Sequence, residues 1–297
     1  MALTPIFFAH AGRQQYFVDA LAAAAPFGLV HVIDLARQDP PDSAQYGRLR
    51  DAYVHLSGNS VTFERDWCLR RYFLLRDDFQ RHGIAEGWML DSDVVLVGPL
   101  PGRAEFPPGT YCAMSYQTEG DPLDHHASAH SSFWTLEALE DFCAFVTDLY
   151  ADRAQELLDL DRARKAKGIR SAVGEMIVLY LWARDNPRVY DAHDFVAGGM
   201  LDHNMRHLEQ PRGVRLKGLS GNKAVTVRPE GVFCETLAGE PVRMRSLHFQ
   251  GKAKLLIHDF VQGNTARYGW KAAARNRWGA IRLGLRRLKG RWAAQKS

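Results

Sequence analysis

Two acidic side chains, Asp91 and Asp93, flank a single serine at the end of an apolar segment that starts at Gly87. A second apolar segment, Val94 to Val97, follows directly. Two carboxylates at this spacing can both reach one divalent cation. Such oxygen ligands suit Mg²⁺ or Mn²⁺, which proteins usually bind through one or two carboxylates together with substrate phosphates. Surface loops also carry paired acids by chance. Evidence from other residues is therefore needed to distinguish a cation site from an ordinary loop.

A second polar group, formed by His248, Gly251 and Lys254, follows the pattern His-x-x-Gly-x-x-Lys. A neutral imidazole can supply a nitrogen ligand to a cation that carboxylates already hold. Glycine lets the backbone approach a phosphate closely, and lysine supplies a positive charge for a diphosphate. The alternative interpretation is a histidine that ends a strand and is followed by a basic surface turn.

Together the two motifs resemble those of the GT-A glycosyltransferases. The best match is the family-eight type, which includes glycogenin-like enzymes and bacterial lipopolysaccharide and capsule glycosyltransferases. The resemblance implies transfer of a hexose from a nucleotide-diphosphate sugar, with a UDP-linked sugar as the expected donor and Mn²⁺ or Mg²⁺ as cofactor. The family often continues Lys-Pro-Trp, whereas two leucines follow the lysine here. The implied metal ligands are Asp91, Asp93 and His248, and the implied diphosphate contacts are Gly251 and Lys254.

The resemblance spans approximately residues 5–260 and implies further donor contacts. These fall on Ala9, Asn59, Arg71, Asp91 and Ser92. In this fold, a basic side chain on the helix before the metal-binding strand commonly meets the donor, and Arg71 is the first candidate, with Arg70 second. The alternative is that Arg70, Arg71 and Arg76 line a solvated helix face.

Glu175 begins an apolar helix, where the helix dipole favours an acidic side chain. A structural role and a position facing the acceptor are both consistent with this placement. If the reaction inverts the sugar, Glu175 is the predicted general base, because deprotonation of an acceptor hydroxyl needs a nearby carboxylate or histidine. His130 in the segment 125–134 and Asp202 in the segment 198–204 are predicted to lie in polar loops on the acceptor side, although plain turns would show the same pattern.

The elements that must position these residues follow an α/β pattern. A strand, a helix and a second strand within about 35 residues are typical of a parallel βαβ unit. We expect one mixed sheet flanked by helices, which is the GT-A class that the resemblance implies. The predicted strands are Pro5–His10, Gly28–Leu35, Trp88–Leu96, Thr110–Ser115, 225–230, 231–236 and one that ends in 247–251. The predicted helices are Gln14–Ala25, Phe63–His82 with Trp67 and Tyr72 inward, Thr135–Tyr150 and Ser171–Arg184, with 155–167 expected as a mobile excursion.

The composition fits a soluble globular protein, with 46% apolar and 24% charged residues among 297. Four scattered cysteines suit a reducing, cytoplasmic setting, and the first residues show no basic leader. Ten of the 38 basic residues lie in 267–297, which contains no acid, so residues 1–266 carry a net charge of −6. We therefore predict a catalytic domain over 1–266 and a basic tail over 267–297.

At helical periodicity, the tail sequence places apolar residues on one stripe flanked by basic residues. They include Trp270, Trp278, Leu285 and Trp292. This pattern is typical of a helix that binds an anionic membrane surface, and it predicts a peripheral location at the inner face of the cell membrane. The alternative is a helix docked on the body. Nucleic acid is not an expected partner, because the body is acidic and no nucleic-acid module is recognisable.

The leading hypothesis is therefore a metal-dependent hexosyltransferase acting on an envelope glycan or a lipid-linked acceptor, such as lipopolysaccharide or capsule. A nucleotidyltransferase or a sugar-nucleotide hydrolase would also need paired acids and a metal. The sequence lacks a glycine-rich phosphate loop with a lysine, which counts against nucleotidyl transfer. A third hypothesis is a non-catalytic membrane or nucleic-acid adaptor with a basic tail.

Overall fold

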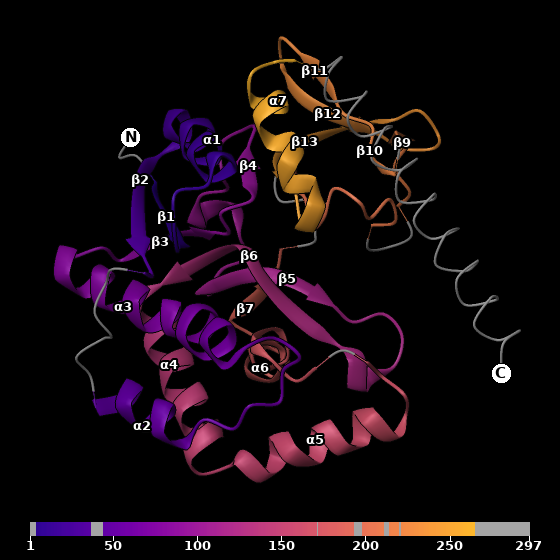
Figure 1. Ribbon diagram of the computed structural model, residues 1–297. Helices are drawn as coiled ribbons and strands as arrows, with labels where there is room; N and C mark the ends of the chain where they lie inside the picture. The colour runs from indigo at the N-terminus through magenta and orange to yellow at the C-terminus, as the bar shows by residue number, and fades with distance from the viewer. Residues whose placement is uncertain are drawn as a thin grey trace, which may run out of the picture.

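The computed structural model describes residues 4–36, 44–170, 172–192, 198–210, 214–219 and 221–264. These residues form a mixed sheet flanked by helices and a second, smaller sheet, so the predicted α/β class is confirmed (Figure 1). The basic tail predicted over 267–297 lies outside the described residues. None of the helices within the described ranges combines the length and the apolar content that crossing a bilayer requires.

The main sheet has six strands and mixed directions. β1 pairs in parallel with β2 and β3, whereas β6 is antiparallel to both β3 and β5. The carboxyl ends of β1, β2 and β3 therefore meet at one edge of the sheet. In spatial order the strands are β2 (Leu29–Asp34), β1 (Pro5–His10), β3 (Glu86–Leu90), β6 (His126–Thr135), β5 (Cys112–Gln117) and β7 (Val189–Asp191).

Side chains of β1 alternate between the two faces of this sheet, as the period of two in a strand requires. Phe7 packs with the helices on one face, while Ile6 and Phe8 pack on the other. The Phe7 face is covered by α3 (Arg70–His82), α4 (Leu136–Ala151) and α6 (Glu175–Ala183), with α2 (Ala44–Ala52) and α5 (Ala154–Ala166) against α4. The opposite face is covered by α1 (Gln15–Ala24) and β4 (Val94–Leu96). Short helical turns are η1 (Ala25–Phe27), η3 (Arg103–Glu105) and η4 (Pro122–Asp124).

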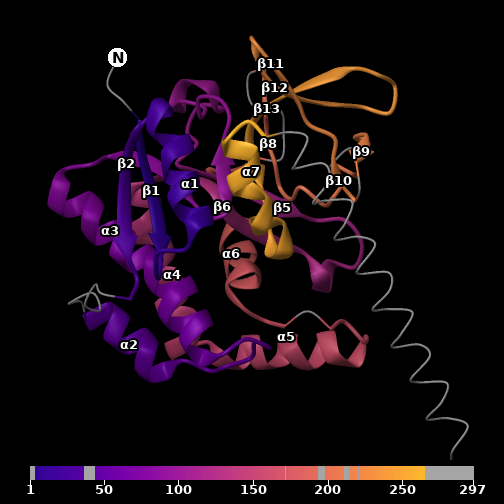
Figure 2. The same cartoon turned by 45° about the horizontal axis from the view of Figure 1, so that its top comes forward.

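The second sheet lies beside α1 and α7 (Figure 2). Its order is β11 (Thr226–Arg228), β12 (Gly231–Glu235), β13 (Pro241–His248) and β4, and β8 (Met200–Leu201) pairs with β13 in parallel. η6 (Gly251–Leu256) and α7 (Ile257–Val261) follow β13 and pack on a third apolar cluster. A separate pair is formed by β9 (Gly218–Leu219) and β10 (Asn222–Lys223).

Local signals explain several helix ends. The Thr135 side chain accepts a hydrogen bond from the Ala138 amide at 3.2 Å, so Thr135 caps α4 as the sequence predicts. α3 ends at Gly83, whose φ of 62° lies in the left-handed region that glycine adopts without a steric penalty. The helix predicted over 63–82 is present in two parts, because η2 (Thr62–Leu69) is a π-helix that continues into α3.

One strand prediction and one loop prediction are wrong. The segment 88–96 is not one interrupted strand, because β3 belongs to the main sheet and β4 to the second sheet. The segment 125–134 is not a polar loop, because it forms most of β6, a strand between β3 and β5. Small side chains such as Ala127, Ser131 and Ser132 hide the usual apolar alternation, yet all three are buried because elements cover both faces of the sheet.

Expectations for three helical segments also differ from the structure. Residues 155–167 are expected as an excursion but form most of α5, where ion pairs such as Lys165 with Asp161 at 2.6 Å join successive turns. The helix predicted over 171–184 begins only at Glu175, with Gly174 as its N-cap, and Ser171 lies outside the described residues. Trp67 is expected to point inward but is 38% exposed.

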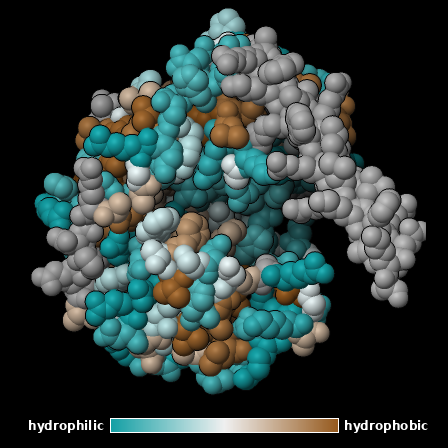
Figure 3. All heavy atoms as spheres, viewed as in Figure 1, coloured by the Kyte–Doolittle hydropathy of each residue, from teal (hydrophilic) through white to brown (hydrophobic). Residues whose placement is uncertain are grey.

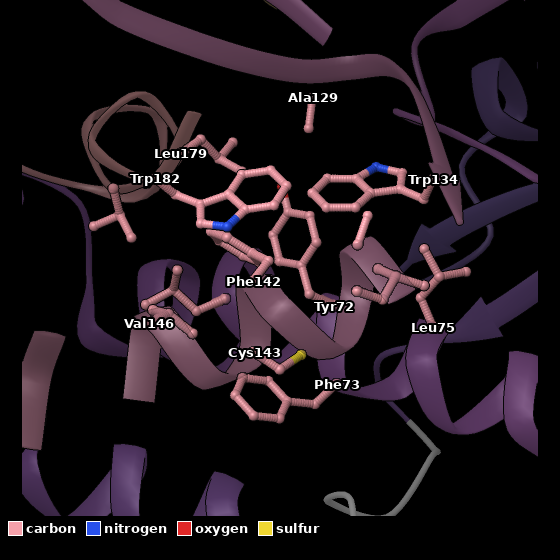
Figure 4. Packing of buried hydrophobic residues seen from close by; sticks show 14 of the residues in the cluster. Tyr72, Phe73, Leu75, Ala129, Trp134, Phe142, Cys143, Val146, Leu179 and Trp182 are labelled. Atoms are coloured by element: carbon pink, nitrogen blue, oxygen red, sulfur yellow. The ribbon is translucent and has the colours of Figure 1, made fainter. Parts of the chain in front are cut away.

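An aromatic cluster fills the space between the main sheet and α3, α4 and α6 (Figure 4). The rings of Trp134 and Trp182 stack at 5.6 Å, and Phe142 meets Trp182 edge-on at 5.2 Å. Tyr72 from α3 lies edge-on to Phe142 at 4.7 Å. Because aromatic rings bury large areas and prefer such tilted contacts, this cluster fixes the three helices relative to the sheet.

Phe142→Ala should lower the free energy of unfolding by about 3–5 kcal/mol, because it opens a cavity among rings that cannot fully collapse. The measurement is the urea-unfolding transition followed by circular dichroism. Leu237→Ala is the matched control, since Leu237 is 61% exposed, and its effect should stay within about 0.5 kcal/mol. Equal losses for the two variants would contradict the assignment of Phe142 to the core.

Candidate active site

A cavity of about 800 Å³ lies where the carboxyl ends of β1 and β3 meet the end of β13. Figure 3 shows a hollow in the middle of this face, lined mainly by hydrophilic residues. The lining comes from strand ends, from η2 and from the starts of α3, α6 and η6. The predicted site residues that line it are Ala9, Asn59, Arg71, Asp91, Ser92, Asp93, Glu175, His248, Gly251 and Lys254.

Backbone pairing brings the two sequence motifs together. β4 is antiparallel to β13, and Val94 lies opposite His248 in their register. The pairing continues past the strands, because the Phe249 amide donates to the Asp93 carbonyl at 2.9 Å. On the other side, the Asp91 amide donates to the His130 carbonyl at 2.8 Å, which ties the acidic turn to β6.

Asp91, Asp93 and His248 each offer a ligand atom, and these atoms lie within 4.8 Å of one another. Within the ranges that the structure covers, this is the only group of three or more His, Cys, Asp or Glu side chains so arranged. Asp93 and His248 are each 4% exposed. Two carboxylates and one imidazole form a donor set that accepts Mn²⁺ and similar divalent ions.

The His248 ring is oriented for ligation. Its Nδ1 lies 2.5 Å from the His203 carbonyl oxygen, which can only accept, so Nδ1 carries the proton. Nε2 faces Asp93, with 3.4 Å between Nε2 and Oδ1. In the neutral imidazole the Nε2 lone pair therefore points toward the carboxylates, as in metal sites where a carbonyl fixes the tautomer of a histidine ligand.

His130 and Asp202 lie behind His248 and not on the cavity wall, which corrects their predicted placement in acceptor-side loops. They are 1% and 0% exposed. The His130 ring stacks on the His248 ring at 4.5 Å, and its Nε2 donates to the Asp202 carbonyl at 3.0 Å. The Asp202 carboxylate accepts from the His248 amide at 2.9 Å and pairs with the buried ammonium of Lys223. These residues position His248.

The charges around Asp93 favour its ionised form. Burial alone would raise the pKa of Asp93, but His248 and Lys254 outweigh it and hold the pKa well below its usual range. The Lys254 ammonium lies 3.1 Å from Asp93 Oδ2. Burial alone would lower the pKa of His248, yet Asp93 raises it. Asp93 is therefore a permanent anion at neutral pH, whereas the charge of His248 depends on pH.

Arg71 joins Asp91 to Glu175. Its Nη1 donates to Asp91 at 2.6 Å, and its Nη2 donates to Glu175 Oε1 at 2.6 Å. The Tyr72 hydroxyl donates to the same Glu175 oxygen at 2.5 Å. Arg71 is 8% exposed, so it lies inside the protein and not on the solvated helix face that the alternative interpretation placed it on. Burial raises the pKa of Glu175 despite these donors.

Glu64 extends this network toward the loop before η2, a role that the sequence did not predict. Its Oε1 accepts from Asn59 Nδ2 at 2.6 Å and from Ser57 at 2.8 Å, and its Oε2 faces the Glu175 amide at 3.3 Å. A Cβ at Gly174 would stand 2.8 Å from Glu64 Oε2, so a larger residue there would displace this carboxylate.

The remaining histidines of the segment 125–134 hold local structure. His125 Nδ1 lies 3.1 Å from the Tyr180 hydroxyl, and His126 Nδ1 lies 2.9 Å from the Asp124 carbonyl. Neither belongs to the three-residue group that could hold a metal ion.

No protein-family model matches the chain, and no curated protein matches it. Among solved structures, the chain is similar to a glycosyltransferase involved in the glycosylation of the major capsid of PBCV-1, with 11% identity, 65% of this chain and 84% of that chain covered, and a TM-score of 0.35. It is similar to mouse xyloside xylosyltransferase 1, with 12% identity, 63% of this chain and 83% of that chain covered, and a TM-score of 0.39. It is also similar to the glycosyltransferase GlyE in Streptococcus pneumoniae TIGR4, with 15% identity, 64% of this chain and 45% of that chain covered, and a TM-score of 0.34. Likeness at this level does not identify the activity of the chain.

Lys223→Met should lower the free energy of unfolding by about 3–5 kcal/mol, because it leaves the buried carboxylate of Asp202 without its counter-ion. Lys217→Met is the matched control. Lys217 pairs with Glu235 at the surface, so its loss should cost at most about 1 kcal/mol. Chemical denaturation measures both values. A change for Lys223→Met as small as that for Lys217→Met would refute the proposed support of His248.

Proposed function

We propose that this chain is a metal-dependent glycosyltransferase of the GT-A type, which moves a hexose from a UDP-linked sugar to an acceptor hydroxyl. The observation that carries the proposal is the convergence of Asp91, Asp93 and His248 in one cavity, with Lys254 and Arg71 beside them. A group that can hold a divalent cation next to the positively charged side chains of Lys254 and Arg71 suits a diphosphate. The cavity volume also lies within the usual range for small-molecule sites.

Asp91, Asp93 and His248 are the residues that would hold Mn²⁺ or Mg²⁺ in this proposal. A divalent ion bound there would neutralise negative charge on the departing diphosphate. Lys254 is assigned to the same task, because its ammonium already lies at the acidic turn and its side chain is 32% exposed. Gly251, at φ 62°, starts the turn that brings Lys254 back toward Asp93. Electrostatic stabilisation of a leaving group is commonly the largest contribution to such transfers.

The proposed reaction breaks the bond between the anomeric carbon and the distal phosphate oxygen of the donor and forms one to the acceptor oxygen. The electron pair of the broken bond remains on the diphosphate. Arg71 is assigned to the donor sugar, together with Ala9 and Ser92 on the cavity wall. Because Arg71 is held at both ends by carboxylates, its guanidinium has little freedom and can orient a sugar hydroxyl.

The acceptor proton has two possible destinations, which depend on the stereochemistry. In an inverting transfer, Glu175 would take the proton, and its raised pKa suits a general base. Against that role, Arg71 and Tyr72 direct three hydrogen bonds to a single Glu175 oxygen. In a retaining transfer, the leaving diphosphate takes the proton, and Glu175 serves to hold Arg71.

The finer assignments extend this proposal. They are the family-eight type, an envelope glycan such as lipopolysaccharide or capsule as acceptor, a catalytic domain over 1–266, and a basic tail over 267–297 that binds an anionic membrane surface. Liposome binding by the full chain and by a chain that ends at residue 266 would test the tail. Release of UDP from UDP-glucose, UDP-galactose and their N-acetyl forms would identify the donor sugar.

UDP with Mn²⁺ should raise the melting temperature of the protein by about 5 °C or more at saturation, because both ligands bind only the folded chain. Asp93→Asn should abolish this shift, because the central carboxylate is lost. Asp185→Asn is the matched control, since the Asp185 side chain is 84% exposed at a surface ion pair. Differential scanning fluorimetry measures all three proteins. If the wild type shows no shift, or Asp93→Asn retains it, the proposed function is wrong.

Binding of Mn²⁺ should weaken several-fold as the pH falls from about 8 to about 6 and should release a proton, because His248 must be neutral to ligate and its pKa is raised. Asp93 contributes nothing to this window, since its pKa lies far below it. Calorimetry in buffers of different ionisation enthalpy measures both quantities. His248→Gln should bind Mn²⁺ more weakly with a flatter pH dependence. An unchanged pH dependence in that variant would remove His248 from the ligand set.

A further inference from the structure

Polar contacts along the cavity floor order its lining residues from one end to the other. At one end, Lys254 contacts Asp93 in the acidic turn. From that turn Asp91 contacts Arg71, and Arg71 contacts Glu175. Beyond this point, Glu64 contacts the Glu175 amide on one side and Asn59 on the other. In the proposed function the donor phosphates bind at the first end. The second end, at Asn59 and η2, is therefore available to another ligand.

Two exposed aromatic rings stand at this second end. Phe63 and Trp67 are 42% and 38% exposed, and both line the cavity. Their centroids are 6.0 Å apart and their planes meet at 64°, so the rings form a corner and not a flat stack. An exposed pair of large aromatic side chains inside a cavity is costly in water unless a ligand covers it.

The π-helix η2 brings these rings and their neighbour Glu64 to different parts of the cavity lining. Glu64 lies between them in sequence, is 6% exposed and turns into the floor, where Ser57 and Asn59 bind it. π-helical turns are rare and often occur at functional sites. η2 therefore contributes both an aromatic wall and a polar floor within five residues, Phe63 to Trp67.

The groups around the rings select the chemical class of the ligand. Asn59 and Arg170, both exposed, line the cavity with the two rings, and the carboxylate of Glu64 lies beneath. A purely apolar chain would cover the rings but would offer no hydrogen-bonding group to Asn59 and Arg170. A pyranose ring meets both demands, because its C–H face packs on an aromatic ring while its hydroxyls bond to amide and guanidinium groups.

We propose that Phe63 and Trp67 form the platform on which the sugar ring of a saccharide acceptor stacks, with Asn59 and Arg170 as hydrogen-bond partners of its hydroxyls. This inference rests on the proposed function, since it assigns the acceptor end of the same cavity. It names the acceptor class as a saccharide and makes Trp67 a determinant of acceptor specificity. The acceptor hydroxyl then approaches the donor across the Arg71–Glu175 pair, which separates the two ends.

Saturation-transfer NMR with the full chain, Mn²⁺ and UDP tests the platform. The probes are methyl and octyl β-D-glucopyranoside and the matching galactopyranosides, the octyl forms below micelle formation. We expect saturation of the ring protons in at least one sugar. Trp67→Ala should weaken binding of that probe about tenfold, the loss expected when an aromatic stacking surface is truncated. Trp67→Tyr, which keeps an aromatic face, should retain most of the affinity.

Three outcomes would overturn the proposal. They are ring protons that receive no saturation from any probe, saturation confined to the octyl chain, and a Trp67→Ala affinity equal to the wild type. Leu237→Ala, at an exposed site outside the cavity lining, is the control and should change neither readout. The thermal shift with UDP and Mn²⁺ separates the two proposals. A lost sugar signal with an intact shift refutes only the platform, whereas a wild type without the shift refutes the proposed function.

Discussion

Three backbone pairs between β4 and β13 hold β4 in the second sheet, and the acidic turn connects β4 to β3 of the main sheet. They set Val94 opposite His248 and so fix which residues meet Asp93. A slip of one residue would turn every side chain of β4 to the other face, so the buried side chains on both faces hold this register. Val95 packs in the cluster of the second sheet, while Val94 and Leu96 pack against the main sheet. The position of the candidate metal ligands thus depends on ordinary apolar packing.

Burial determines how the charged side chains of the site are arranged. Asp93 and Arg71 are both nearly inaccessible, and such groups are stable only when each has a partner of opposite charge. Acids and bases therefore alternate along the cavity floor, from Lys254 through Asp93 and from Asp91 through Arg71 to Glu175. A second alternation lies behind the wall, where Lys223 neutralises Asp202. Because each group is held by at least one neighbour, the site is organised before any ligand arrives.

The sequence predicted the parts of this arrangement that depend on local pattern. The apolar runs identified β1, α1 and α3, and the two spaced motifs placed Asp91, Asp93 and His248 together. The sequence did not predict the features that depend on tertiary packing. The small residues of β6 show no strand pattern, yet they lie buried in the main sheet. His130 and Asp202 carry the polar signature of a surface loop, and only the structure reveals that they support His248 from behind. Lys223 gives no signal, since its partner lies in another segment.

The continuous helical segment formed by η2 and α3 contributes residues to several parts of the cavity described above. It carries Phe63 and Trp67 on the wall, Glu64 on the floor and Arg71 beside the acidic turn. One residue later, Tyr72 lies in the aromatic core and still donates to Glu175, so the rigid part of the fold reaches directly into the site. The same stretch changes from π-helical to α-helical geometry at Arg70, between the aromatic wall and Arg71. That change of pitch sets the angle between the wall and the charged floor, and an unbroken α-helix would direct these side chains differently.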